Sequence, residues 1–379
     1  FKDVLHAQSQ NPPANDERIA AYAEAVSQGL EAPGPVRDFF GELLSIRHDI
    51  GSSHLATKTL RAAQKQLYGH HPDYPRGFLT AGQWQEGLDW IFDDHDRAGD
   101  FTVDIWARPL QSNVSDRYKS LKAFGAIARN FGRVGIFSVM DVGCSQNAGL
   151  NHLASGVSFG MPSVIRPESQ AHQPSLRHTA AFHRALAEEL PLGHSVGIDT
   201  YDPLDARSWA WSCSFYPSEL LNEERVALFD ALIRAKYDAV DFFQGNFADF
   251  DTARFAHLHG KQDFNIVNFS TVLYQADEAD RSAMLTAASN YAQEFVVVQD
   301  FLQIDPDNPT KLQFRENWQD DPFPYRFVVR DMHEDTGAWH EVFKWRDGRC
   351  RELAIGMGRI AVGEGYKASV WAGLDTLAD

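Results

Sequence analysis

The sequence predicts an α/β protein in which a helical N-terminal domain precedes a doubly wound, mostly parallel sheet. In residues 1–110, apolar residues recur at helical spacing, and no strand-like alternation of useful length interrupts them. Residues 111–379 instead alternate short apolar, β-branched segments with helical ones, which is typical of a parallel sheet covered on both faces. Within that part, the apolar segment Ile136–Met140 leads directly into an acid, a glycine-containing turn and a helix.

Four helices are expected in the N-terminal domain. The apolar face of the first is formed by Ile19, Tyr22, Val26 and Leu30. Asn15 or Asp16 precedes this face as an N-cap, because a short polar side chain accepts hydrogen bonds from the first free backbone amides. The other helices are expected at Phe39–Ile46, Leu55–Leu67 and Ala81–Phe92.

The expected sheet is built from apolar segments separated by helices. The first strand, Ile136–Met140, follows a helix whose apolar face is Leu121, Phe124, Ile127 and Phe131. Later strands are expected to end at Asp199, Gly245, Ser270 and Asp300. The clearest helix between them spans Glu223–Lys236. Two further segments, Tyr325–Asp331 and Glu341–Trp345, flank the turn sequence HEDTGAW and predict a C-terminal antiparallel β-hairpin.

Composition and charge exclude several classes of function. A hydrophobic content of 44% with 23% charged residues is ordinary for a globular protein. No apolar run approaches the roughly 20 residues that span a bilayer, so we expect no integral membrane protein. The formal net charge of −17 opposes a nucleic-acid footprint, which needs clustered Lys and Arg. The expected partner is a small molecule or another protein, and the oligomeric state is left open.

Cysteine usage indicates a reducing compartment. Cys144, Cys213 and Cys350 are widely spaced and odd in number, so they form no disulfide framework. No CxxC pair is present to indicate a zinc site. We therefore expect a cytoplasmic protein.

The residues after Ile136–Met140 have the features of a ligand-binding turn. Asp141 comes directly after the apolar segment. The small and polar residues that follow are Gly143, Ser145, Asn147 and Gly149. Strand, acid, turn and helix in this order are typical of the first unit of a nucleotide-binding doubly wound sheet, where turn amides and the helix N-terminus meet the ligand.

Several ordered stretches of the chain are similar to those of a bacterial family. They are Gln111-Ser112-Asn113-Val114 with Arg117; Asp141, Gly143 and Ser145 with Ala148-Gly149-Leu150-Asn151; Asp199 with Asp202-Pro203-Leu204-Asp205; Trp209 and Trp211; and Gly245-Asn246. On these residues the chain resembles the family named domain of unknown function 2332, which is grouped with methyltransferase-like folds. The likeness covers most of Gln111–Asp300 and, more loosely, the helical N-terminus.

The resemblance implies a Rossmann-like class I fold that uses S-adenosylmethionine to methylate a small-molecule acceptor. Methyl transfer from a sulfonium needs little acid–base machinery, because holding the nucleophile, methyl carbon and sulfur in line supplies most of the acceleration. Ser145 and Asn147 stand where general methyltransferases favour glycine, and Asn246 replaces an acid. The alternative is therefore a non-catalytic or repurposed protein of this fold that binds a nucleoside-like ligand or a protein partner.

The resemblance assigns the cofactor to residues at the ends of the predicted strands: Asp141, Gly143, Ser145, Gly149, Asp199, Asn246 and Phe247. Asp141 and Gly143 are expected to hold the methionine portion, and Gly143 would allow close backbone approach. The alternative for Asp141 is an acid that caps the following helix. Asp199 is expected to accept hydrogen bonds from the ribose hydroxyls, in preference to Glu168, whose Pro-rich surroundings make a poor strand.

The adenine ring and the acceptor are assigned to later strand ends. Asn246 is expected to hydrogen-bond to adenine and Phe247 to stack on it, with core packing as the alternative for Phe247. The acceptor is expected near Ser270 and Tyr274, which follow the fourth strand and are also the candidate catalytic residues. A hydroxyl bonded within a turn is the alternative there.

Three polar residues precede the first helix of the α/β domain. Gln111, Asn113 and Arg117 are expected to close over the cofactor or to bind a substrate carboxylate, for which Arg offers a bidentate fork. The alternative is a polar network that ties the helical cap to the sheet. The residues alone do not separate these two interpretations.

Three other patterns are interpreted as structural. Gly156–Gly160 spells GxSxG, with His333 or His340 as possible bases, but a helix and not a strand precedes it. Gly356–Ala361 resembles a dinucleotide fingerprint, yet too little chain follows for a βαβ unit. His257 with His259, and the run Asp93-Asp94-His95-Asp96, are read as helix-end or solvated residues, so no metal site is predicted.

Overall fold

The computed structural model describes residues 1–46, 51–108, 110, 114–162, 164–167, 176–202, 207–260, 263–314, 321–355, 359–363 and 366–369. The chain forms two compact units: Phe1–Asn113 with Leu204–Ala231 (unit 1), and Val114–Pro203 with Leu232–Asp379 (unit 2). Several residues named above lie outside the described ranges: Gln111, Asn113, Glu168, Asp205 and Gly356–Gly358.

Unit 1 is helical, as the apolar periodicity predicts. Its helices are α1 (Lys2–Gln10), η1 (Pro13–Asn15), α2 (Glu17–Gly29), α3 (Pro35–Ile46), α4 (Ser52–Leu67), α5 (Ala81–Phe92) and α6 (His95–Ala107). The Asp16 side chain caps α2 by accepting from the Arg18 amide at 2.9 Å, so the second of the two predicted N-caps is used. Thr80 and Gln83 form a capping box at the start of α5. None of the described helices combines the length and apolarity that a membrane crossing requires.

A later segment of the chain belongs to unit 1, whereas the sequence analysis placed all of 111–379 in one domain. This segment contains α10 (Arg207–Ser214), η3 (Pro217–Leu221) and the start of α11 (Glu223–Arg234). Buried Gln64 of α4 donates to the Ser212 and Phe215 carbonyls at 2.8 and 2.9 Å, and the Tyr68 and Trp211 rings lie 4.0 Å apart. These partners are distant in sequence, so local periodicity does not report their contact.

Unit 2 contains the sheet. Its strands are β1 (Val139–Val142), β2 (Val164–Pro167), β3 (Ser195–Asp199), β4 (Val240–Gln244), β5 (Phe264–Ser270), β6 (Ala292–Ile304), β7 (Leu312–Phe314), β8 (Tyr325–Asp331), β9 (Trp339–Trp345) and β10 (Glu352–Ile355). Within the described ranges the strand order is β2-β10-β9-β8-β6-β5-β1-β3-β4, and β7 pairs with β6. Strands β11 (Arg359–Gly363) and β12 (Tyr366–Ser369) pair separately.

The strand order confirms the predicted fold class. Strands β4, β3, β1, β5 and β6 are parallel neighbours, and β8 and β9 extend the sheet as an antiparallel hairpin. Apart from β2, which pairs with β10 at the far end of the sheet, the chain proceeds outward from β1 through β3 to β4, then returns to the other side of β1 for β5 and β6. The resulting switch point lies between β1 and β5, where doubly wound sheets bind ligands at the carboxyl ends of their strands.

The largest differences from the predicted strand boundaries are in β1 and β6. β1 begins at Val139 and not at Ile136, whose side chain is 64% exposed. Ahead of β1, Phe137 and Leu192 form an isolated parallel bridge, and the backbone amide of Ser138 donates to the Asn265 side chain at 3.0 Å and not to a strand carbonyl. Asp141 consequently lies inside β1 and does not end it. β6 likewise continues past the predicted end at Asp300 to Ile304, because its last residues pair with β7.

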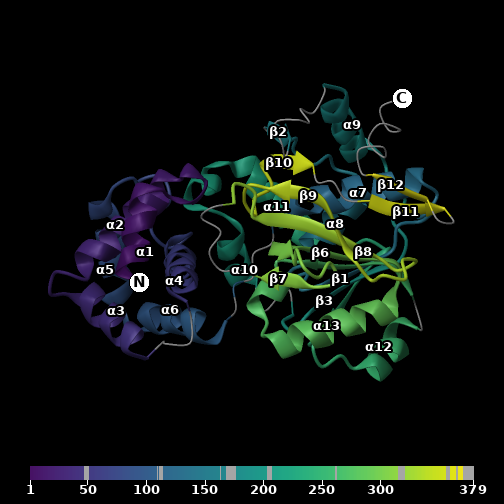
Figure 1. The fold of residues 1–379 in the computed structure, drawn as a ribbon. Coiled ribbons are helices and arrows are strands. Elements are labelled where there is room, and N and C mark those ends of the chain that lie inside the picture. The colour runs from purple at the N-terminus through teal and green to yellow at the C-terminus, as the bar shows by residue number, and fades with distance from the viewer. Residues whose placement is uncertain are drawn as a thin grey trace. The chain divides into compact units, whose positions relative to one another are not determined.

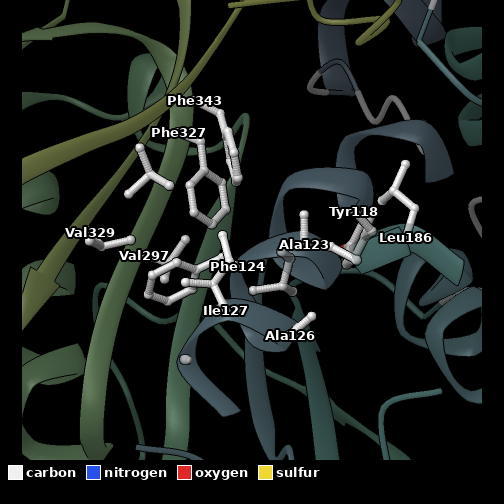
Figure 2. Packing of buried hydrophobic residues seen from close by; sticks show 14 of the residues in the cluster. Tyr118, Ala123, Phe124, Ala126, Ile127, Leu186, Val297, Phe327, Val329 and Phe343 are labelled. Carbon is white, nitrogen blue, oxygen red and sulfur yellow. The ribbon is translucent and has the colours of Figure 1, made fainter. Parts of the chain in front are cut away.

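Helices cover both faces of the sheet (Figure 1). α7 (Tyr118–Asn130), α8 (Ala148–Ser155) and α9 (Leu176–Ala187) enclose one hydrophobic core, and α12 (Thr252–His259) and α13 (Glu278–Tyr291) enclose the other. Figure 2 shows Phe124 and Ile127 of α7 beside Val297, Phe327 and Val329. The Phe124 and Phe295 rings meet edge to face at 4.9 Å. Alternation along β1 directs Val139 and Asp141 to the α7 face.

Candidate functional site

Four strands place their ends in one row at the switch point. Val142 pairs with Ile198 of β3 and with Phe269 of β5, so the next positions bring Asp199, Gly143 and Ser270 side by side. Ser270 pairs in turn with Gln299 of β6. The row of Asp199, Gly143 and Ser270 is the candidate site, and it joins three residues that the sequence analysis singled out.

Asp141 lies beneath this row in the core. Its carboxylate is fully buried and accepts from the Tyr118 hydroxyl of α7 and, at 2.7 Å, from Asn268 Nδ2 of β5. Burial raises the pKa of Asp141 to about 7 and the charge of Asp199 adds to this, while the two hydrogen bonds act in the opposite direction. Asp141 thus joins β1 to α7 and β5, and its contact with the methionine portion of a cofactor stays a prediction.

One carboxylate oxygen of Asp199 accepts a short hydrogen bond, whereas the other has only long contacts. Oδ2 accepts from the Ser145 amide at 2.8 Å. Oδ1 lies 3.4 Å from both Thr200 Oγ1 and the Tyr201 amide, which is longer than an ordinary hydrogen bond. Burial raises the pKa of this carboxyl, and the Ser145 amide opposes the shift. Asp199 Oδ1 can therefore accept a hydrogen bond from a ligand.

The turn glycines are needed for packing. Gly143 has a φ of +72°, and a Cβ there would lie 2.0 Å from Val272 Cγ2. A Cβ on Gly149 would lie 1.9 Å from two ring atoms of Tyr118. Both close approaches are made by side chains of the protein, which explains the two glycines by packing; their contact with a cofactor stays a prediction.

Buried polar atoms without hydrogen-bond partners mark the candidate site. Among the described residues they include Ser145 Oγ, Asn147 Oδ1 and Ser270 Oγ. Buried polar groups in proteins are usually satisfied, so each of these atoms calls for a water or a ligand group. Together with Asp199 Oδ1 they supply the acceptors and hydroxyls that the ribose and amino-acid portions of S-adenosylmethionine require, and in this respect the residues fit that cofactor.

The predicted adenine residues have structural contacts. The exposed Asn246 accepts from the Ala248 amide at 3.0 Å in a side-chain-closed turn. Phe247 is 3% exposed, with its ring 4.7 Å from Phe250 and 5.8 Å from Phe269. The alternative interpretation of Phe247, core packing, describes its position.

A second buried acid lies at the end of the neighbouring strand. Asp300 is fully buried and accepts from the Tyr274 amide at 3.1 Å and from the Phe301 amide at 2.8 Å. Burial raises the pKa of Asp300 to about 7, against the effect of these amides and of the Arg117 charge. Asp300 thereby anchors η4 (Leu273–Gln275), which carries the candidate residue Tyr274. The sequence placed Asp300 at a strand end but indicated no role for it.

Arg117 makes polar and aromatic contacts with Gly348 and with Tyr325 of β8. Its Nε donates to the Gly348 carbonyl at 3.0 Å, and its guanidinium lies 5.8 Å from the Tyr325 ring. The Tyr325 hydroxyl is 2.7 Å from Thr271 Oγ1. These contacts lie within unit 2, so they show neither of the two roles expected of Arg117, and both stay predictions.

Replacing Tyr325 by Phe tests these contacts. Both partners of the Tyr325–Thr271 hydrogen bond are buried, so the variant leaves the Thr271 hydroxyl unsatisfied. We expect the free energy of unfolding to fall by about 1–3 kcal/mol, measured by urea denaturation. The control Tyr237→Phe removes a hydroxyl from a half-buried side chain before β4 and should change stability by less than about 0.5 kcal/mol. Equal effects in the two variants would contradict the assignment.

The GxSxG pattern has no nucleophile-elbow geometry. α8 runs to Ser155, and Gly156 ends it with a φ of +67°. The elbow requires a strand at this point, so the structural interpretation is confirmed.

No protein-family model matches the chain, and no curated protein does. Among solved structures, the chain is similar to the sugar N-methyltransferase KedS8 from Streptoalloteichus sp ATCC 53650, at 17% identity and a TM-score of 0.26 over 56% of this chain and 59% of that one. It is also similar to DesVI from Streptomyces venezuelae (15% identity, TM-score 0.25, 57% and 63% coverage). A third likeness is to an O-methyltransferase family protein from Burkholderia thailandensis (12% identity, TM-score 0.26, 80% and 77% coverage).

The chain thus spans less than two thirds of KedS8 and of DesVI. The family resemblance drawn from the motifs stays a prediction. The strand order and the residues at the switch point are the features of the chain that bear on its activity.

Proposed function

We propose that the protein is an S-adenosylmethionine-dependent methyltransferase acting on a small-molecule acceptor. The observation that supports this most is the row formed by Asp199, Gly143 and Ser270 at the switch point of a doubly wound sheet. Ligands of such sheets bind at this edge, and an acid at the end of the second parallel strand is suited to ribose hydroxyls.

In this proposal Asp199 Oδ1 accepts from the ribose, and the hydroxyls of Ser145 and Ser270 hydrogen-bond to polar groups of the cofactor. When bound, S-adenosylmethionine supplies an electrophilic methyl group on a sulfonium. Asp141 acts indirectly, because its bonds to Tyr118 and Asn268 hold β1, α7 and β5 together beneath the turn. Asp300 similarly holds η4, and hence Tyr274, at the edge where the acceptor is expected.

The contribution of the protein to methyl transfer is then mainly positional. A buried, rigid platform that holds two reactants in line can supply about 7–11 kcal/mol of barrier lowering without a proton transfer. Ser270 and Tyr274 remain the candidates for contact with an acceptor hydroxyl or amine, and neither is assigned as a general base.

A second candidate function is binding of a nucleoside-like ligand without catalysis. Two observations favour it: the Val272 side chain packs against Gly143, and the Ser145 amide occupies Asp199 Oδ2. Val272 fills space beside Gly143, and the Ser145 amide takes one acceptor of Asp199. In a methyltransferase, the cofactor would be expected to use that space and that acceptor.

Calorimetric titration with S-adenosylhomocysteine tests the proposed site. We expect binding to the full chain and at least about tenfold weaker binding to Asp199→Asn, since a hydrogen bond to a charged group contributes about 1.5–3 kcal/mol. Asn keeps an oxygen for the Ser145 amide and removes the acceptor that faces the ligand. The control Asp249→Asn alters an exposed acid of unit 2 and should bind as the parent does.

The outcomes separate the two candidates. Absence of heat at millimolar S-adenosylhomocysteine contradicts the methyltransferase proposal. Adenosine binding that Asp199→Asn also weakens, without binding of S-adenosylhomocysteine, would favour the nucleoside-binding alternative. Transfer of a labelled methyl group to a small-molecule fraction would support catalysis directly.

A further inference from the structure

Two histidines and an aspartate meet away from the candidate site. His194 directly precedes β3, Asp241 is the second residue of β4, and His259 ends α12. One potential ligand atom from each lies within 4.8 Å of the others. The cluster lies toward the amino ends of β3 and β4, whereas Asp199 ends β3 at its carboxyl end.

The distances within the cluster fit coordination better than hydrogen bonding. Asp241 Oδ2 lies 3.7 Å from His194 Nδ1 and 3.6 Å from His259 Nδ1. Both separations exceed the roughly 2.7–3.2 Å of a hydrogen bond. Two ligand atoms held about 2.1 Å from one tetrahedral ion are about 3.4 Å apart, which is close to the two distances between Asp241 Oδ2 and the histidine nitrogens.

Core phenylalanines lie beside both imidazole rings; the His259 side chain is 10% exposed and that of His194 is 31% exposed. The His259 ring lies 5.0 Å from Phe255 and 6.0 Å from Phe243, and the His194 ring lies 6.4 Å from Phe264. These phenylalanines belong to the core on the α12 face. Rings held by a packed core lose little conformational freedom when they bind an ion, which favours a preorganised site.

We propose that His194, Asp241 and His259 bind a divalent transition-metal ion, with Zn²⁺ as the best fit. Imidazole nitrogens and a carboxylate are standard zinc ligands, and a fourth position would be taken by water. The ion would join the C-terminal end of α12 to the edge strand β4 and to the start of β3. This site is independent of the proposed methyl transfer and contributes to the stability of the sheet edge.

The sequence analysis interpreted His257 and His259 as helix-end residues and predicted no metal. His259 does end α12. His194 and Asp241 lie in other parts of the chain, so the spacing of these residues in the sequence does not indicate the cluster. His257 is exposed on the same helix and outside the cluster, which makes it a matched control.

The test is titration of the chelator-treated full chain with Zn²⁺ by calorimetry, with Co²⁺ absorption as a probe of coordination. We expect one equivalent to bind and to raise Tm by mass action. His194→Ala and His259→Ala should each weaken binding by more than the roughly 10–100-fold typical of losing an outer-shell partner, and His257→Ala should leave it unchanged. Asp241→Asn, which keeps the side-chain shape, should also weaken binding.

Far-UV circular dichroism establishes that each variant is folded before titration. Failure of the folded parent chain to bind Zn²⁺ up to millimolar concentration overturns the proposal. So does binding that survives His194→Ala and His259→Ala, or a loss of equal size in His257→Ala, since either result places the ion elsewhere on the surface.

Discussion

Gly149→Ala is expected to destabilise unit 2 by about 2–3 kcal/mol, although alanine is normally the better helix former by about 1 kcal/mol. Gly149 lies in the first turn of α8, and the added methyl would stand 1.9 Å from two Tyr118 ring atoms. The ring cannot move freely, because it is buried and its hydroxyl donates to Asp141. The clash therefore outweighs the helix propensity, and urea denaturation should show a lower midpoint.

A double-mutant cycle isolates the cause. In a Tyr118→Ala background the ring is absent, so Gly149→Ala should become neutral or stabilising, with a coupling energy of about 2 kcal/mol or more. The control Gly160→Ala adds a methyl in the same unit where nothing lies within 4 Å, and it should have little effect. If Gly149→Ala costs the same with and without the Tyr118 ring, the proposed packing is wrong.

The stability of the protein is expected to fall as the pH rises from about 4 to about 7. The pKa values of Asp141 and Asp300 are raised by burial from 3.8 to about 7 in the folded chain. Between these values the unfolded chain has released the protons that the folded chain still holds, so raising the pH favours unfolding. Each acid can contribute up to about 4 kcal/mol to this fall, which should level off above about pH 7.

The contribution of each of these two acids can be isolated by comparing the free energy of unfolding of a single variant with that of the parent chain at each pH. Asp141→Asn preserves the shape of the side chain, and its amide can donate to Tyr118 while its oxygen accepts from Asn268. Its free energy of unfolding relative to the parent should therefore rise steadily between pH 4 and pH 7 by up to about 4 kcal/mol, and Asp300→Asn should behave similarly. The control Gly160→Ala changes no titratable group, so its difference from the parent should not vary with pH. A flat profile for Asp141→Asn would contradict the assignment of a buried, protonated acid.

Part of the candidate site was predictable from local patterns. The apolar segment that ends at Asp199 and the one that ends at Ser270 were placed correctly as β3 and β5. Parallel neighbours in a doubly wound sheet then bring such strand ends together. The role of Asp141 was not predictable in the same way, because its burial depends on Tyr118 from a helix and on Asn268 from a strand far along the chain.

Local patterns were enough to predict the helical N-terminal region, the alternation of strands and helices, and the C-terminal hairpin. Periods of two and about 3.6 residues report which side of an element is buried, and this information is local. The folded chain was needed to show that residues 207–231 belong to the helical unit, that a tyrosine ring packs against Gly149, and that His194, Asp241 and His259 lie close together. Those contacts link elements distant in the chain, and the periodicity of one element carries no information about the identity of its neighbour.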